Sequence, residues 1–309
     1  MSQAAASLAA TGPRPREQRF GLGCALITPF AADGSIDVAR LVGHARRVLA
    51  EGCTSVTLFG TTGEGASVGL AARAAALDGM AAAGFDFPRQ VLGGVAASSI
   101  EDAVAQADQL SAAGSRGLLL APPFYFKGPG DEGLYRWFAT VLERARRPGE
   151  VILYHIPSVT DVPLSSALIA RLARAFPGVV AGIKDSSGDW ATTQRYLADH
   201  PQLHVLVGDE RQLARAIRHG GSGAINGFSN FCAPLLRPMV DDGTEVPAVA
   251  ALVDLVLEFP VTPAVKALVA HRTGDEAFLR TAPPLVPTEP AARARLAAAF
   301  DALRAAHNG

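Results

Sequence analysis

Charged side chains are scarce in this sequence. Asp, Glu, Lys and Arg make up 18% of the 309 residues, and 28 basic against 29 acidic side chains leave a net charge of -1. An average soluble domain has about 25% charged residues. A chain without a basic surplus does not attract nucleic acid or an anionic membrane, so we expect neither as a partner. The sparse charge also indicates that further surface is buried between subunits.

Cysteine is almost absent. The three cysteines, Cys24, Cys53 and Cys232, lie far apart in the chain and have no C-x-x-C spacing. This pattern predicts neither a disulfide scaffold nor a zinc site, so no metal is expected. Three isolated cysteines fit a reducing compartment, and we expect a cytoplasmic protein.

Long apolar runs are also missing. A membrane helix needs about 18 consecutive apolar residues. The most apolar C-terminal segment is interrupted by Asp254, Glu258 and Pro260. We therefore expect no membrane-spanning helix.

The first residues of the chain look unlike a folded element. Residues 1–19 carry Pro13 and Pro15, which interrupt any amphipathic helix. We predict a disordered N-terminal tail over residues 1–19.

From Phe20 onward, short aliphatic or β-branched runs alternate with longer Ala/Leu/Arg-rich segments of helical period. Repeated strand–helix units of this kind are typical of α/β folds with a parallel sheet. Eight such units predict a closed (β/α)8 TIM barrel over residues 20–245, and residues 246–309 are expected to form a C-terminal helical extension. The predicted strands are 22–27, 55–59, 90–93, 117–120, 151–154, 179–183, 204–207 and 223–225.

Lysine is scarce among the basic residues. Only Lys127, Lys184 and Lys266 occur, so 28 minus 3, or 25, of the basic residues are arginines. A guanidinium stays protonated and cannot act as an amine nucleophile. Lys184 ends a predicted apolar strand, where desolvation favours a neutral amine that can attack a carbonyl and form a Schiff base. Lys127 and Lys266 are expected at the surface.

Two further strand ends carry groups suited to such chemistry. Tyr125 follows the predicted fourth strand after two prolines, and its phenol is a reasonable proton shuttle beside a lysine. The turn Gly60-Thr61-Thr62-Gly63-Glu64 offers successive backbone N–H groups and two hydroxyls at a strand-to-helix junction, a geometry suited to a carboxylate. Each feature alone also fits a purely structural role.

Together these strand ends resemble the dihydrodipicolinate synthase and N-acetylneuraminate lyase family of Schiff-base (β/α)8 enzymes. The resemblance runs from roughly Phe20 to Val286. It implies that Lys184 condenses with pyruvate or another 2-oxo acid without any cofactor, that Thr61 and Thr62 hold the carboxylate, and that Tyr125 moves protons. The motifs that carry it are ALITPF (25–30), GTTGE (60–64), PFY (123–125), YHIP (154–157), GIKD (182–185), GAIN (223–226) and PAVK (263–266).

Other strand-end residues are expected to line the substrate site. They comprise Gly60, His155, Ser186, Gly208 and Asn226. His155 stands where the family often has asparagine, and the small residues after Lys184 leave room for a hydroxylated substrate.

The sequence departs from the synthases of this family at positions that bind the substrate. In synthases an arginine after the Tyr125 motif binds the carboxylate of the aldehyde partner, whereas Phe126, Lys127 and Gly128 stand here. The leading hypothesis is therefore a lyase that cleaves or forms a 2-oxo acid by aldol chemistry, with pyruvate and an aldehyde as components. The alternatives are a 2-keto-3-deoxy sugar acid dehydratase, a 4-hydroxy-tetrahydrodipicolinate synthase and an inactive pyruvate-binding protein.

Overall fold

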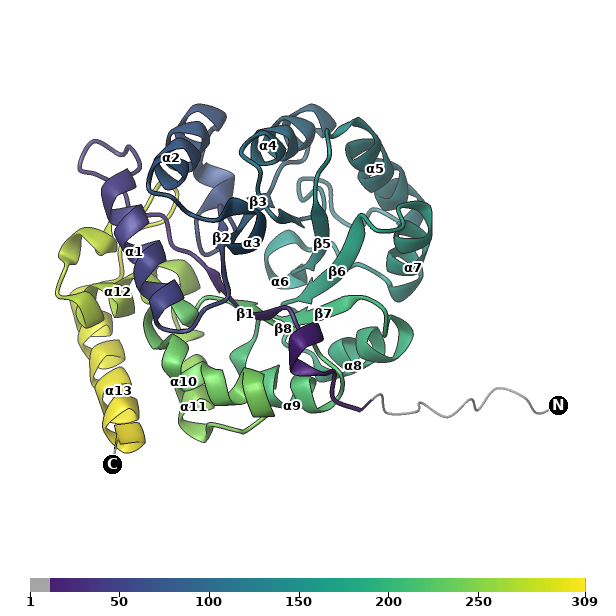
Figure 1. The fold of residues 1–309 in the computed structure, drawn as a ribbon. Coiled ribbons are helices and arrows are strands. Elements are labelled where there is room, and N and C mark those ends of the chain that lie inside the picture. Colours follow the sequence, from purple (N-terminus) through teal and green to yellow (C-terminus); the bar gives the residue numbers. More distant parts are fainter. Residues whose placement is uncertain (1–11, 309) are drawn as a thin grey trace.

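Eight parallel strands close into a barrel in chain order, β1 to β8, so the predicted (β/α)8 TIM barrel is confirmed (Figure 1). The computed structural model describes residues 12–308. Each strand lies within about two residues of its predicted position. The strands are β1 (Gly21–Ala25), β2 (Ser55–Leu58), β3 (Val91–Val95), β4 (Gly117–Leu120), β5 (Glu150–His155), β6 (Val180–Asp185), β7 (His204–Val207) and β8 (Gly223–Asn226).

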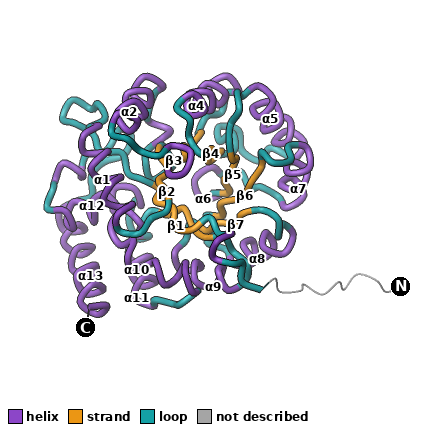
Figure 2. Tube along the Cα trace, viewed as in Figure 1, coloured by secondary structure: helices purple, strands orange, loops and turns teal. Residues whose placement is uncertain are grey.

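A ring of helices surrounds the barrel (Figure 2). The helices before the end of the eighth unit are α1 (Val38–Ala50), α2 (Leu70–Ala82), α3 (Phe87–Gln90), α4 (Ile100–Ala112), α5 (Asp131–Arg144), α6 (Pro157–Thr160), α7 (Ser166–Ala175), α8 (Trp190–Asp199), α9 (Leu213–Arg218) and α10 (Ser229–Asp242). Three more follow them: α11 (Pro247–Val256), α12 (Val261–Thr273) and α13 (Pro290–Asn308). Among residues 12–308, no helix has both the length and the apolar character required to cross a membrane.

Local sequence signals set the helix ends. The side chain of Asp37 accepts a hydrogen bond from the Arg40 amide at the start of α1, and Ser99 does the same for the Asp102 amide at the start of α4. Both satisfy backbone donors that the first helical turn leaves free. Gly114 follows α4 with a φ of 74°, the left-handed conformation that glycine adopts without steric cost.

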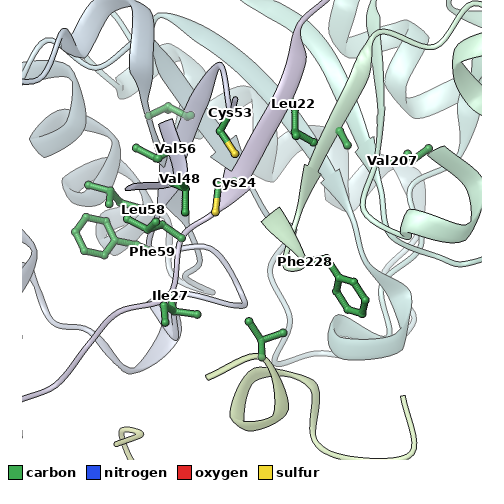
Figure 3. Close-up of a cluster of buried hydrophobic side chains, with 14 of the residues drawn as sticks. Leu22, Cys24, Ile27, Val48, Cys53, Val56, Leu58, Phe59, Val207 and Phe228 are labelled. Carbon is green, nitrogen blue, oxygen red and sulfur yellow. The ribbon is translucent and has the colours of Figure 1, made fainter. Parts of the chain in front are cut away.

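The core has two layers because side chains alternate between the two faces of every strand. Inside the barrel, Leu119, Ile152, Leu206 and Ile225 pack together with few polar neighbours. The other face of the strands packs against the helices, as the labelled side chains around Leu22 show (Figure 3). The parity of a residue, meaning its odd or even place in the alternation along the strand, therefore decides whether it faces the barrel interior or a helix.

The cysteines meet in this outer layer. Cys24 of β1 lies beside Cys53, which precedes β2 (Figure 3). Cys232 of α10 is close to both. Burial raises the pKa of the Cys24 thiol well above its ordinary value, and the neighbouring Cys53 adds to the effect. All three are free cysteines buried in the core. Burial raises the pKa values of Cys24 and Cys232 and makes them poor nucleophiles, and Cys53 packs against Cys24, so this cluster is structural.

Asn230, at the start of α10, joins three parts of the fold. Its amide nitrogen donates to the carbonyls of Ala25 and Gly227 at 2.8 Å each, and its oxygen accepts from the Ile27 amide at 3.0 Å. The same oxygen lies 2.9 Å from Nε2 of His44 on α1. Every hydrogen-bonding group of this buried amide is used, which ties the ends of β1 and β8 to α1 and α10.

His44 is held in its neutral form. Arg47 can only donate, so its bond of 2.7 Å to Nδ1 makes that nitrogen an acceptor and leaves the proton on Nε2, facing Asn230. Burial lowers the pKa of His44 from 6.5 to about 3, and the Arg47 charge acts in the same direction.

The C-terminal helices pack on the barrel through α10. On α13, Leu296, Phe300 and Leu303 are buried, and the Phe300 ring lies 5.3 Å from that of Phe231 in α10. The predicted helical extension is therefore present, while the boundary at residue 246 stays a prediction. Figure 1 shows α13 at the edge of the molecule beside α12.

Part of the expected tail is folded onto the barrel. Arg14 donates to the carbonyls of Pro201 and Leu203 at 2.8 and 2.9 Å, and Arg19 donates to that of Val240 at 2.8 Å. The prediction of disorder is wrong for residues 14–19, because their arginines find carbonyls that the helix and strand ends leave free. Residues 1–11 lie outside the described part of the chain.

We expect protein stability to fall with acid because of His44. Its pKa is lower in the folded state than the unfolded value of 6.5, so below that pH the unfolded chain binds a proton that the folded chain refuses. The contribution of His44 to the free energy of unfolding is present above pH 6.5 and is lost as the pH falls towards the folded-state pKa. The loss amounts to about 2 kcal/mol between about pH 7 and pH 5. Urea unfolding at several pH values measures it. The amide of His44→Gln can still donate to Asn230 but does not titrate. Between the same two pH values, this variant is expected to lose about 2 kcal/mol less unfolding free energy than the unmodified protein. An equal loss in both proteins would contradict the role of His44.

Candidate active site

Lys184 lies inside the mouth of the barrel. It is the fifth residue of β6, and its side chain is 4% exposed. The parallel register places it opposite Tyr154 of β5, so both side chains leave the sheet on the same face. The Lys184 Nζ lies 3.2 Å from the Tyr154 hydroxyl and 4.2 Å from the centre of its ring. A phenol thus stands within proton-transfer distance of the amine.

Tyr125 is not the phenol beside Lys184, so its predicted placement is wrong. Its side chain is 74% exposed, and its ring packs edge-on against Phe126 in the loop after β4. Tyr125 lies five residues beyond the last residue of β4, too far for the strand to direct it into the barrel. Strand alternation was the signal for Tyr154, because it occupies the inward-facing parity of β5 as Lys184 does in β6.

The turn after β2 extends the same line of polar groups. Thr61 Oγ1 lies 3.4 Å from the Tyr154 hydroxyl. The hydroxyl of Thr28 donates to the Gly63 carbonyl at 2.6 Å. A Cβ at Gly65 would lie 1.7 Å from the Phe59 carbonyl oxygen, so the close approach of the backbone requires glycine there. Lys184, Tyr154 and Thr61 are therefore connected at the mouth of the barrel.

A buried arginine holds the turn after β2 in place. Arg73 of α2 is 1% exposed and donates to the carbonyls of Gly65 and Gly94 at 2.9 and 2.8 Å. Its guanidinium also lies 4.7 Å from the centre of the Phe59 ring. Burial lowers the pKa of Arg73 to about 10, which leaves it charged at neutral pH. The ends of β2 and β3 are thereby held by one cation.

Thr62 and Gly60 belong to the same turn. Gly60 lines the cavity beside Tyr154. Thr62 is partly buried on the side of β8, where a Cβ at Gly227 would lie 3.5 Å from its Oγ1. Both predicted binding residues are therefore at the mouth of the barrel.

Lys266 is not at the surface. Its side chain is fully buried on α12, where it forms an ion pair with Glu64, the last residue of the GTTGE turn. The ammonium also donates to the Arg280 carbonyl and lies 4.6 Å from the centre of the Phe30 ring, while Glu64 accepts the Ala282 amide at 2.7 Å. The surface expectation was wrong because α12 is buried on most of its faces. The turn is anchored to the C-terminal segment of the chain.

His155 and Asn226 are strand-end residues that face away from the barrel interior, so both placements in the mouth are wrong. The Nδ1 of His155 accepts the Leu164 amide at 3.0 Å, and its ring packs edge-on against Tyr196. Burial lowers the pKa of His155, and the nearby Asp185 opposes that shift. Asn226 accepts from the amide and hydroxyl of Ser229 and thereby caps α10. Both have the parity that points towards the helices.

Ser186 and Gly208 lie next to Lys184, as expected. A Cβ at Gly208 would lie 3.1 Å from the Lys184 Cε and 2.0 Å from the Ser186 Oγ. Only glycine leaves this space open beside the amine. Neither residue has an assigned role in the chemistry.

Glu210 is a buried group that the sequence did not single out. It is 4% exposed and accepts the Phe228 amide at 3.0 Å. Burial raises the pKa of Glu210 to about 7, while its backbone hydrogen bonds and the Lys184 charge act to lower it. Its position three residues after the last residue of β7, in the segment that follows Gly208, was the available signal.

A cavity of about 340 Å³ opens beside Thr61 and Tyr154. It lies over the ends of β2 to β5 and is bounded by α6 and by Pro284 and Leu285. Lys184 does not line this cavity itself, since its amine lies just behind the Tyr154 hydroxyl. The candidate site therefore consists of the Lys184–Tyr154 contact and an adjoining cavity.

Comparison with known proteins agrees with this architecture. The model of the dihydrodipicolinate synthetase family matches residues 19–301, and the chain belongs to this family. An uncharacterized DapA-like lyase of Chloroflexus aurantiacus is 33% identical over 92% of this chain and 97% of its own length. The predicted family is thus confirmed, and so is the prediction that the chain is a lyase.

Solved structures show the same likeness. The crystal structure of dihydrodipicolinate synthase from Agrobacterium tumefaciens str. C58 has a TM-score of 0.90 and 49% identity, covering 92% of this chain and 99% of that one. YagE, a prophage protein of E. coli K12 solved in complex with pyruvate, has a TM-score of 0.79 at 24% identity and covers 92% of this chain and 98% of its own. The second likeness concerns the fold alone.

Removing the cation of the Glu64–Lys266 pair should destabilise the protein strongly. Lys266→Met leaves the Glu64 carboxylate buried without its counter-ion, and we expect a loss of about 3 to 5 kcal/mol in the free energy of unfolding. Adding Glu64→Gln should recover part of the loss. Arg295→Met, which breaks the exposed Arg295–Glu258 pair, is the matched control and should cost less than about 1 kcal/mol. Equal losses in the two single variants, measured by urea unfolding, would contradict this account.

Proposed function

We propose that this lyase cleaves or forms a carbon–carbon bond of a 2-oxo acid by aldol chemistry, with pyruvate as one component and an aldehyde as the other. The single observation that supports this function is the sequence of contacts from Lys184 through Tyr154 to Thr61, at 3.2 and 3.4 Å. It combines a nucleophile, a proton shuttle and a hydroxyl of the turn suited to a carboxylate.

In the proposed reaction, the Lys184 amine gives up a proton and its nitrogen attacks the ketone carbon of pyruvate. Tyr154 donates a proton to the carbinolamine oxygen, which leaves as water, and an iminium ion remains. The iminium withdraws electrons, so a proton is lost from the methyl carbon and an enamine forms. Because the lysine imine itself accepts the electron pair, the proposal needs no metal or organic cofactor.

The turn after β2 is proposed to bind the carboxylate of pyruvate. Thr61 is already next to the Tyr154 hydroxyl, and Thr62 follows it on the same turn. Arg73 and the Glu64–Lys266 pair hold the backbone of that turn in place. A rigid carboxylate site would orient the ketone towards Lys184. Gly208 and Ser186 are proposed to shape the space around the imine.

A second candidate is supported by one comparison. The Agrobacterium tumefaciens protein at 49% identity is described as a dihydrodipicolinate synthase. The same imine would then serve 4-hydroxy-tetrahydrodipicolinate synthesis. The two candidates share every step up to the enamine and differ only in the aldehyde that the enamine attacks.

We also propose a homodimer or homotetramer in the cytoplasm. The exposed aromatic pair Tyr125 and Phe126, 74% and 77% accessible, and the low content of charged residues both support self-association.

Borohydride reduction in the presence of pyruvate tests the nucleophile. We expect a stable adduct on Lys184, located by peptide mass spectrometry, because reduction converts the imine into a secondary amine. Lys184→Ala should prevent labelling, whereas Lys127→Ala should leave it unchanged. An adduct on Lys127, or none at all, would show that the proposed imine does not form.

The second test concerns Tyr154 and needs no knowledge of the aldehyde. Exchange of the methyl protons of pyruvate for deuterium, followed by NMR, reports enamine formation. We expect Tyr154→Phe to slow this exchange by about 100-fold or more while the protein stays folded, because the proton shuttle is lost. Tyr135→Phe, a partly buried tyrosine on α5, is the control. A larger loss in Tyr125→Phe than in Tyr154→Phe would return the role to the loop tyrosine.

A further inference from the structure

The cavity beside Tyr154 has an apolar wall. Its lining continues from the inward-facing residues Leu119 and Ile156 of the barrel to Phe124 and Val159 at the rim, with Leu285 on the opposite side. Val159 is 59% exposed, which places it at the opening. A molecule that extends from the Tyr154 hydroxyl into this space meets mainly hydrocarbon.

No positive charge faces the cavity from any described residue that lines it. The one charged lining residue is Glu64, and its carboxylate already pairs with Lys266 and the Ala282 amide. The nearest lysine along the rim, Lys127, donates to the carbonyls of Phe124 and Thr160 instead. A second carboxylate, placed beyond the GTTGE turn against Phe124 and Val159, would lose its hydration without gaining a counter-ion.

The hydroxyls of the wall are also largely occupied. Thr160 Oγ1 donates to the Ile156 carbonyl at 3.0 Å, and Ser67 Oγ donates to the Pro283 carbonyl at 3.3 Å. A substrate with several hydroxyl groups would therefore bury some of them without partners. An apolar group has no hydrogen bonds to lose in the same place, and its transfer out of water is favourable in free energy.

We propose that the aldehyde component carries an apolar substituent, aromatic or branched aliphatic, and that this substituent occupies the cavity between Tyr154 and Val159. The inference rests on the proposed aldol function and narrows its substrate class. The enamine carbon attacks the aldehyde carbon, the new carbon–carbon bond forms, and the aldehyde oxygen takes up a proton to become a hydroxyl. Water then hydrolyses the iminium and frees Lys184. Cleavage is the reverse of these steps. The hydroxylated substrate expected from the small residues after Lys184 does not match this wall.

Condensation of pyruvate with a panel of aldehydes tests the inference. Benzaldehyde and isobutyraldehyde represent the apolar class, glyceraldehyde the hydroxylated class and succinic semialdehyde the carboxylate class. We expect kcat/KM for benzaldehyde to exceed that for glyceraldehyde and for succinic semialdehyde by about 10-fold or more. A preference for either polar aldehyde would overturn the inference, and a preference for succinic semialdehyde would favour the synthase candidate.

One substitution at the rim tests where the substituent binds. Val159→Arg places a guanidinium at the opening, and we expect the ratio of kcat/KM for succinic semialdehyde to that for benzaldehyde to rise by about 10-fold. Leu257→Arg, at an exposed aliphatic position that does not line the cavity, is the matched control and should leave the ratio unchanged. An unchanged ratio in Val159→Arg would show that the aldehyde binds elsewhere.

Borohydride trapping tests the imine at Lys184 independently of the apolar class of the aldehyde. If Lys184 is labelled with pyruvate but polar aldehydes are preferred, the imine function stands and the apolar acceptor class is wrong. If Lys184 is not labelled, the proposed function itself fails.

Discussion

The two-residue alternation of side chains along parallel strands is the constraint on which the site depends. In a closed barrel one face of every strand points to a shared interior, and the other packs against helices. Lys184 and Tyr154 have the inward parity on neighbouring strands and meet across the register. Asp185 and His155, one residue further along, are paired by the same register and face outward. Position along the strand alone thus separates the candidate site residues from the residues that support the strands.

The outward-facing polar groups have a consistent structural use. Asp185 accepts the Thr193 hydroxyl of α8 at 2.6 Å, and Asn226 caps α10. Asn230 extends the pattern by joining β1 to α1 through His44. Each of these three side chains makes hydrogen bonds to a helix or a strand end, so the barrel is fixed to its helical ring by directional bonds as well as by apolar contact. That rigidity holds the strand ends, and with them the site, in one geometry.

Sequence patterns predicted the barrel well because its signals are local. Apolar runs, the caps at Asp37 and Ser99, and the glycine after α4 each act within a few residues. The placement of Lys184 at the barrel mouth was predicted for a related reason, since Lys184 ends an apolar strand in a chain that otherwise uses arginine. The positions of Thr61, Ser186 and Gly208 followed from the same strand ends.

The parts that sequence misplaced depend on three-dimensional context. Tyr125 is near a strand end in sequence, but a loop intervenes and turns its ring to the surface. His155 and Asn226 are at strand ends with the wrong parity, which is defined only once the register is known. Lys266 is buried because its partner, Glu64, comes from a turn 202 residues earlier, and no local pattern reports such a pairing.

The Glu64–Lys266 pair also has a consequence for how the chain reaches its working form. A polypeptide leaves the ribosome from its N-terminus, so the turn that bears Glu64 is made long before α12. Until α12 arrives, that carboxylate has no buried counter-ion, and the loop beside Tyr154 lacks one of its anchors. We therefore expect this turn to reach its final geometry only after α12 has been made, and a chimera that exchanges the C-terminal helices with a relative needs a lysine at this position to keep the pair.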